Sequence, residues 1–159
     1  MKPNFVARAL LVLVLICGHV GSVAGQSSQP PPSKRVMALC DAFRTQFGDL
    51  GKMIGSIADR EEASGVTQMA TVAELNAERC VSVHSLLFTY ELIPPGPNKA
   101  KVGEYVAFRL EQYAVLKTDT EYANRMIALT KLPGVAREAQ TLRDRLRTFA
   151  ELTRTLEPR

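Results

Sequence analysis

Residues 33–59 read SKRVMALCDAFRTQFGDLGKMIGSIAD, and this stretch decides the fold. Its apolar residues recur at alternating spacings of four and three: Val36, Cys40, Phe43, Phe47, Leu50, Ile54 and Ile57. A helix with about 3.6 residues per turn places all of them on one face. Because such a helix gains most of its stability by burying that face, the stretch predicts packing against other helices, and hence a helical bundle.

Turn and capping signals divide the chain that follows. Residues 60–70 are polar and contain a Ser-Gly pair at 64–65, so we expect a connector with a turn there. Thr71 and Glu74 form a capping box, which predicts the start of the second helix. The prolines within residues 94–97 end that helix.

A third helical region runs from Asn98 to Leu132 and contains a polar patch at residues 117–120, where we expect the helix to kink or split. Pro133 begins the last helix, whose apolar face ends at Leu156. The alternation of apolar and polar residues that is typical of strands is absent from the sequence. The predicted fold is therefore all-α: a single-domain, up-and-down bundle of about four helices.

Three glycines, Gly48, Gly51 and Gly55, interrupt the first predicted helix. Each costs roughly 1 kcal/mol relative to alanine inside a helix. Either a neighbouring helix approaches closely over these positions, or the helix bends there. Of these two explanations we favour close approach.

The first 24 residues have the pattern of a secretory signal peptide. Lys2 and Arg8 are basic, residues 9–16 are apolar, and small residues follow, so we expect cleavage after Ala24, or otherwise after Gly25. The apolar run is shorter than the roughly 20 residues that span a bilayer. An uncleaved anchor is the alternative.

The expected domains are a signal peptide (1–24), a flexible Pro-rich lead-in (25–33) and the bundle (34–159), with no transmembrane segment in the mature chain. Two of the 20 basic residues and none of the 16 acidic residues precede residue 25, so the mature chain carries a small net positive charge. This charge is too small to indicate binding to nucleic acid or to an anionic membrane. We expect a periplasmic protein, with full secretion as the alternative.

After cleavage only Cys40 and Cys80 remain, and both lie on apolar helix faces. In an exported protein such a pair predicts a disulfide between the first two helices. A tight turn at Gly65 would offset the two residues by about 15 Å, whereas a disulfide needs Cα atoms within about 7 Å. We therefore expect residues 60–70 to run back along the first helix as an extended strap. The alternatives are a bend at the glycines, a link between chains, or free thiols.

Metal or haem binding is a further alternative. Cys80 and His84 are four residues apart and share one helix face, where Cys40 completes a set of three zinc ligands. His84 is also the single histidine of the mature chain that could bind a haem iron. A Cys–His pair at this spacing is a weak signal, so we interpret His84 as a polar residue on the helix flank and expect no cofactor.

Arg79, Arg109 and Arg125 are the basic residues nearest to the predicted apolar faces. If they point inward, they can bind a small anion between helices. In the simpler interpretation, their charged ends reach solvent at the edge of each face.

No motif identifies a reaction or a family. The sequence contains neither a G-x-S-x-G elbow nor a Gly-rich phosphate loop after a strand, and His84 is the single candidate base, so no catalytic residue is assigned. We expect an exported, non-enzymatic helical bundle that binds another protein or a component of the cell envelope. The alternatives are a small all-α enzyme or anion-binding protein, and a metal- or haem-binding bundle.

Overall fold

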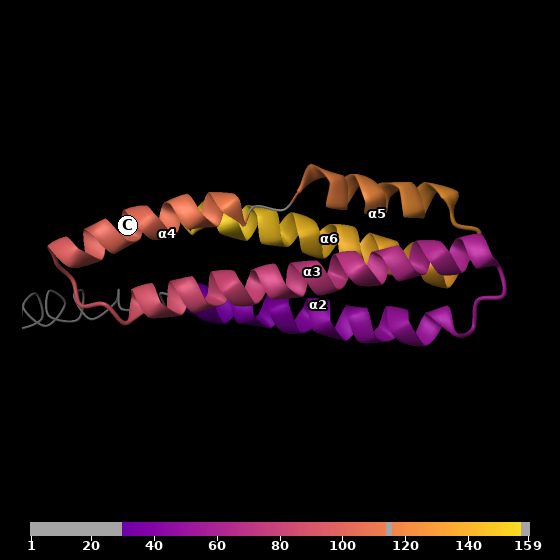
Figure 1. The fold of residues 1–159 in the computed structure, drawn as a ribbon, viewed down its shortest axis with the longest axis horizontal. Helices are drawn as coiled ribbons and strands as arrows, with labels where there is room; N and C mark the ends of the chain where they lie inside the picture. The colour runs from indigo at the N-terminus through magenta and orange to yellow at the C-terminus, as the bar shows by residue number, and fades with distance from the viewer. Residues whose placement is uncertain (1–29, 114–115, 157–159) are drawn as a thin grey trace, which may run out of the picture. The chain divides into compact units, whose positions relative to one another are not determined.

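A computed structural model describes residues 30–113 and 116–156. None of these residues belongs to a strand, and most belong to helices (Figure 1): α2 (Pro32–Ile54), α3 (Arg60–Glu91), α4 (Pro97–Gln112), α5 (Lys117–Leu129) and α6 (Pro133–Thr155). The all-α prediction is confirmed. None of the helices described is long and apolar enough to cross a membrane. The predicted signal peptide and residues 25–29 of the lead-in lie outside the described residues.

These helices form an up-and-down bundle within one compact unit that begins at Pro31. α2 and α3 pack side by side as an antiparallel hairpin, and α6 packs against both (Figure 1). α4 and α5 follow one another end to end and together occupy the place of the predicted third helix. The expected split is confirmed, because α5 begins at Lys117, the first residue of the polar patch.

α3 begins earlier than predicted, at Arg60 rather than Thr71. Asp59 caps this end: its carboxylate accepts hydrogen bonds from the backbone N–H groups of Glu61 (2.8 Å) and Glu62 (3.0 Å). A carboxylate in this position satisfies two N–H groups that lack a partner within the helix and lies at the positive end of the helix dipole. The true capping signal is therefore Asp59, and the predicted capping box lies within the helix.

The predicted connector over residues 60–70 is wrong, because these residues form the first turns of α3. Gly65 does not turn the chain. It lets α5 pack closely, since a Cβ atom at this position would lie 2.6 Å from Cε of Met126. Val66 and Met69 on the same segment are fully buried, so the segment that reads as polar in sequence contributes an apolar face to the core.

The N-terminal end of α2 is held by the C-terminal end of α3. α2 begins at Pro32, so Ser33, which is of a residue type common at helix N-caps, lies inside the helix and is buried. Glu91 takes the role of the cap: its carboxylate accepts a hydrogen bond from the Ser33 N–H (2.9 Å) and another from the Ser33 hydroxyl. Ser33 therefore does not cap α2, and its contact with Glu91 fixes where α2 lies along α3.

The core lies where α2, α3 and α6 meet. The rings of Phe43 and Phe149 pack edge to face there, with centroids 6.3 Å apart. The buried residues recur at helical spacing along α2, α3 and α6: Val36, Cys40, Phe43 and Leu50; Ala73, Asn76, Cys80, Val83 and Leu87; and Val135, Ala139, Leu142, Leu146, Phe149 and Leu156. For α2, the predicted apolar face therefore gave most of the residues that lie in the core.

Phe47 departs from this pattern. It is 40% exposed, whereas its neighbour Gln46 is buried. α2 packs against two helices, and Gln46 faces α6, where its amide donates to the backbone carbonyl (2.9 Å) and the carboxylate (3.1 Å) of Glu138. Phe47 lies at the edge of the contact between α2 and α3, where it lines a surface hollow together with Ala77 and Val81 of α3.

The favoured explanation of the glycines in α2 is also wrong. A Cβ atom at Gly48, Gly51 or Gly55 would meet no atom within 4 Å, so no helix approaches closely there. α2 continues through Gly48 and Gly51 and ends at Ile54. Gly96, which precedes α4, has a backbone φ of 154°, a value that residues other than glycine rarely adopt.

Gly51→Ala is expected to raise the free energy of unfolding by about 0.5–1 kcal/mol, because alanine favours the helix and nothing obstructs its Cβ. Gly96→Ala is expected to lower the free energy of unfolding by more than about 1 kcal/mol, because its backbone is strained for alanine. Urea denaturation followed by circular dichroism measures both. A loss of stability in Gly51→Ala would show that a neighbour covers this face of α2.

Candidate functional site

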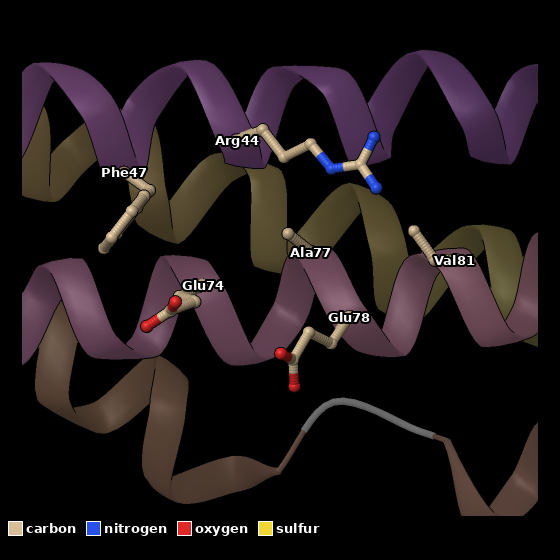
Figure 2. A pocket seen from close by; sticks show the side chains of 6 residues that line it. All are labelled: Arg44, Phe47, Glu74, Ala77, Glu78 and Val81. Atoms are coloured by element: carbon tan, nitrogen blue, oxygen red, sulfur yellow. The ribbon is translucent and has the colours of Figure 1, made fainter.

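An open groove of about 390 Å³ lies between α2 and α3 (Figure 2). It is lined by Arg44 and Phe47 from α2 and by Glu74, Ala77, Glu78 and Val81 from α3. The short side chain of Ala77 leaves the space that Phe47 and Val81 border. The groove therefore presents apolar surface to solvent on the same hairpin that forms half of the core.

The two edges of the groove carry opposite charges. Glu74 and Glu78 lie one turn apart on α3, and Arg44 projects from α2 on the other side (Figure 2). Among the described residues neither carboxylate is in an ion pair, and Arg44 makes a long contact of 3.6 Å with Asp41. Like charges at this spacing repel by about 0.2–0.5 kcal/mol, so a cation between the two carboxylates would be stabilised.

Two further exposed apolar side chains lie on the same hairpin beyond the groove. Phe88 lies two turns after Val81 on α3 and is 50% exposed. Met37 lies two turns before Arg44 on α2 and is also exposed. At 1.5 Å per residue, the distance along α3 from Ala77 to Phe88 is about 17 Å, the length of a helix of three turns.

Cys40 and Cys80, predicted to form a disulfide, face each other across the α2–α3 interface, and both are fully buried. The disulfide prediction is not met in this structure: the residues are free thiols 3.7 Å apart, whereas a disulfide bond measures about 2.05 Å. A hydrogen bond between the thiols lowers the pKa of Cys40 and raises the pKa of Cys80, and burial raises the pKa of Cys80 further. The helices thus adopt the register that pairing requires, without the covalent bond.

This register is reached without the expected strap. Counted along each helix from the facing cysteines, Ile54 lies opposite Val66, so the first turns of α3 extend beyond the end of α2. The overhang from Val66 back to Arg60 is about 9 Å at 1.5 Å per residue. Residues 55–59, which lie outside both helices, span this distance.

His84 is half-buried at one end of the hairpin. Its Nδ1 atom lies 2.9 Å from the carbonyl oxygen of Ser33, and its ring stacks on Phe88 with centroids 5.9 Å apart. No group of three His, Cys, Asp or Glu residues in the described part of the chain is placed to hold a metal ion. The alternative ligand set of Cys40, Cys80 and His84 is therefore not assembled.

The three arginines considered for an anion site lie on three different helices and are not brought together. Arg109, on α4, donates to Oε1 of Gln112 (2.9 Å) and to the hydroxyl of Tyr113 (2.8 Å). Arg125, on α5, is exposed, with its guanidinium carbon 5.7 Å from the centroid of the Tyr122 ring. Neither lines the groove.

Arg79, the third of these arginines, joins a polar cluster that fastens α5 to α3. Its Nη1 atom donates to Oδ2 of Asp119 (2.7 Å) and to Oδ1 of Asn76 (3.1 Å). The amide of the fully buried Asn76 donates to Oδ2 of Asp119 (3.1 Å) and to the carbonyl of Val72 (2.8 Å). The Arg79 guanidinium is therefore bound to Asp119 and Asn76, and its charge helps to hold α5 on α3.

Sequence reasoning missed a fourth arginine, Arg145 of α6. Its Nη1 atom is buried without a hydrogen-bond partner, as is Oε1 of Gln46, and burial lowers the pKa of the Arg145 guanidinium. Glu138 and Asp49 oppose this change in pKa through their negative charges. Arg145 could have been selected from the sequence because it directly precedes Leu146 on an apolar face. Arg79 and Arg109 were selected because they lie next to apolar residues in the same way.

A second cavity, of about 410 Å³, lies at the start of α3 and the end of α5, and is lined by Asp59, Glu61, Glu62, Ser64, Gly65, Gln68, Tyr122, Met126, Leu129, Thr130 and Lys131. Its polar groups already serve the fold. The Glu62 carboxylate accepts from the Thr130 hydroxyl and the Lys131 N–H, both at 2.7 Å. The Tyr122 hydroxyl donates to the carbonyl of Gly65 (2.8 Å), and burial raises the pKa of Tyr122.

Comparison of the chain with protein-family models, with curated proteins and with solved structures finds no match in any of the three. A function is therefore inferred from the groove itself.

Asp119→Ala is expected to lower the free energy of unfolding by about 1–3 kcal/mol, because it leaves the Arg79 guanidinium and the Asn76 amide short of an acceptor. Asp144→Ala is a matched control, since Asp144 pairs with Arg143 on the surface of α6 and its loss should cost less than about 1 kcal/mol. Urea denaturation of both variants measures the difference. Equal effects would contradict the role given to the cluster.

Proposed function

We propose that this chain is an exported, non-enzymatic protein-binding module, and that an amphipathic helix of the bound protein lies in the groove between α2 and α3. The observation that carries the proposal is the half-exposed ring of Phe47 beside the unpaired carboxylates of Glu74 and Glu78. A contiguous apolar surface with a charged rim is typical of a site that another protein covers.

The shape of the groove favours a helix as the bound element. Helices bind grooves of this kind by placing apolar side chains from successive turns along the floor. The apolar surface from Ala77 to Phe88 has the length of about three turns. The acidic edge formed by Glu74 and Glu78 favours a partner that carries basic residues beside its apolar face.

The proposed location of this module is the periplasm or the extracellular space. The support for it is the signal-peptide pattern of residues 1–24. An oxidising compartment would also supply disulfide-bearing oxidants, which take up two electrons and two protons when they convert facing thiols such as Cys40 and Cys80 into a disulfide.

A designed helical peptide with an apolar face flanked by a row of lysines is expected to bind the purified mature protein, as measured by fluorescence anisotropy. The double variant Glu74→Lys/Glu78→Lys is expected to weaken binding about 10-fold or more, because attraction at the acidic edge becomes repulsion. Binding by the unsubstituted protein should also weaken as salt concentration rises.

Glu151→Lys is the matched control, since Glu151 is an exposed glutamate on α6, away from the groove. It should leave the affinity for the lysine peptide unchanged, and a peptide with glutamates in place of the lysines should bind more weakly. Equal affinities for all these proteins and peptides would contradict the proposal.

A further inference from the structure

α4 carries a second apolar face that no other described part of the chain covers. Gly103, Val106 and Leu110 are buried against the rest of the fold. On another side of the same helix, Tyr105 is 55% exposed and Phe108 is 56% exposed. The apolar residues of α4 therefore extend beyond the face that the bundle buries.

Charged residues of opposite sign flank these two aromatics. Lys101, Tyr105 and Arg109 follow one another at spacings of four and form one row along α4. Glu104, Phe108 and Glu111 form the adjacent row. Among the described residues, Lys101, Glu104 and Glu111 are in no ion pair.

The groove has the complementary arrangement. Its α3 edge is acidic at Glu74 and Glu78, and its α2 edge is basic at Arg44, with Phe47 between the edges. A helix with one basic row and one acidic row, each containing an exposed aromatic, matches both edges at once. The outward face of α6 does not, because its exposed residues are polar: Gln140, Asp144, Arg147, Thr148 and Glu151.

We infer that the chain binds a second copy of itself, with α4 of one copy in the α2–α3 groove of the other. The basic row containing Lys101 then lies along Glu74 and Glu78, and the acidic row containing Glu104 lies beside Arg44. This inference rests on the proposed function, since it names the helix that the groove accepts.

The contact joins two different surfaces, so it is head-to-tail. Each head-to-tail contact leaves one groove and one α4 unoccupied, so further copies add until a ring closes or an open filament forms. The inference therefore predicts assemblies larger than a dimer as concentration rises.

Sedimentation velocity of the mature protein, over concentrations from micromolar to about 1 mM, tests this directly. The unsubstituted protein is expected to assemble, and Phe47→Gln and Phe108→Gln are each expected to remain monomeric. Leu129→Gln is the control, because Leu129 on α5 is more exposed (73%) than either Phe47 or Phe108. It lies outside both the groove and the exposed face of α4. Circular dichroism establishes that each variant is folded.

Mixing the two monomeric variants gives the most specific result. Phe47→Gln retains an intact α4 and Phe108→Gln retains an intact groove, so an equimolar mixture should form a complex of two chains and nothing larger. A mixture that stays monomeric would overturn the inference, as would an unsubstituted protein that is monomeric throughout or a Leu129→Gln variant that fails to assemble.

The lysine peptide separates this inference from the proposed function. If the peptide binds in the groove while the unsubstituted protein stays monomeric, the self-association is wrong and the protein-binding function stands. If the protein assembles through the groove and the peptide does not bind, the proposal of a foreign helix fails and the groove accepts its own α4.

Discussion

The register of α2 on α3 is the constraint on which the rest of the structure depends. It is fixed at one end by the contact of Ser33 with Glu91 and in the middle by the facing thiols of Cys40 and Cys80. With these helices aligned, Phe43 points into the core and Phe47 lies at its edge. The same alignment that forms the core therefore also forms the groove, and the two cannot be altered independently.

The buried face of a helix could be predicted from sequence where that helix packs against its neighbours on one side only. Cys40 and Cys80 were placed correctly on facing helices because apolar spacing alone determines them. Phe47 could not be placed, because α2 contacts both α3 and α6, and the side that each helix takes depends on tertiary packing. The start of α3 was missed because the first turns of this helix are mostly polar in sequence, so Asp59 did not stand out as a cap. These turns pack against α5 at Gly65, a contact that the sequence alone does not show.

The site was harder to predict than the fold, because it consists of side chains that remain exposed after the helices have packed. Arg79 stands near an apolar face in the sequence, as expected, but its charge is taken up by Asp119. Tyr105 and Phe108 are apolar residues on the same helix as the buried Val106, and the side of α4 that packs on the bundle leaves them exposed. Exposed apolar patches with a charged rim are typical of surfaces that another protein covers, which is why the function is proposed for these surfaces.

Oxidation of the folded, reduced mature protein with diamide, which takes up the two thiol hydrogens, tests the α2–α3 register most directly. Peptide mapping is expected to find Cys40 joined to Cys80 in a monomer that has lost two hydrogens and keeps its helical circular dichroism. The link should raise the stability of the protein by about 4 kcal/mol, since it closes a long loop. Cysteine-linked dimers in place of this product, or a link that forms only in denaturant, would contradict the register and the groove that it builds.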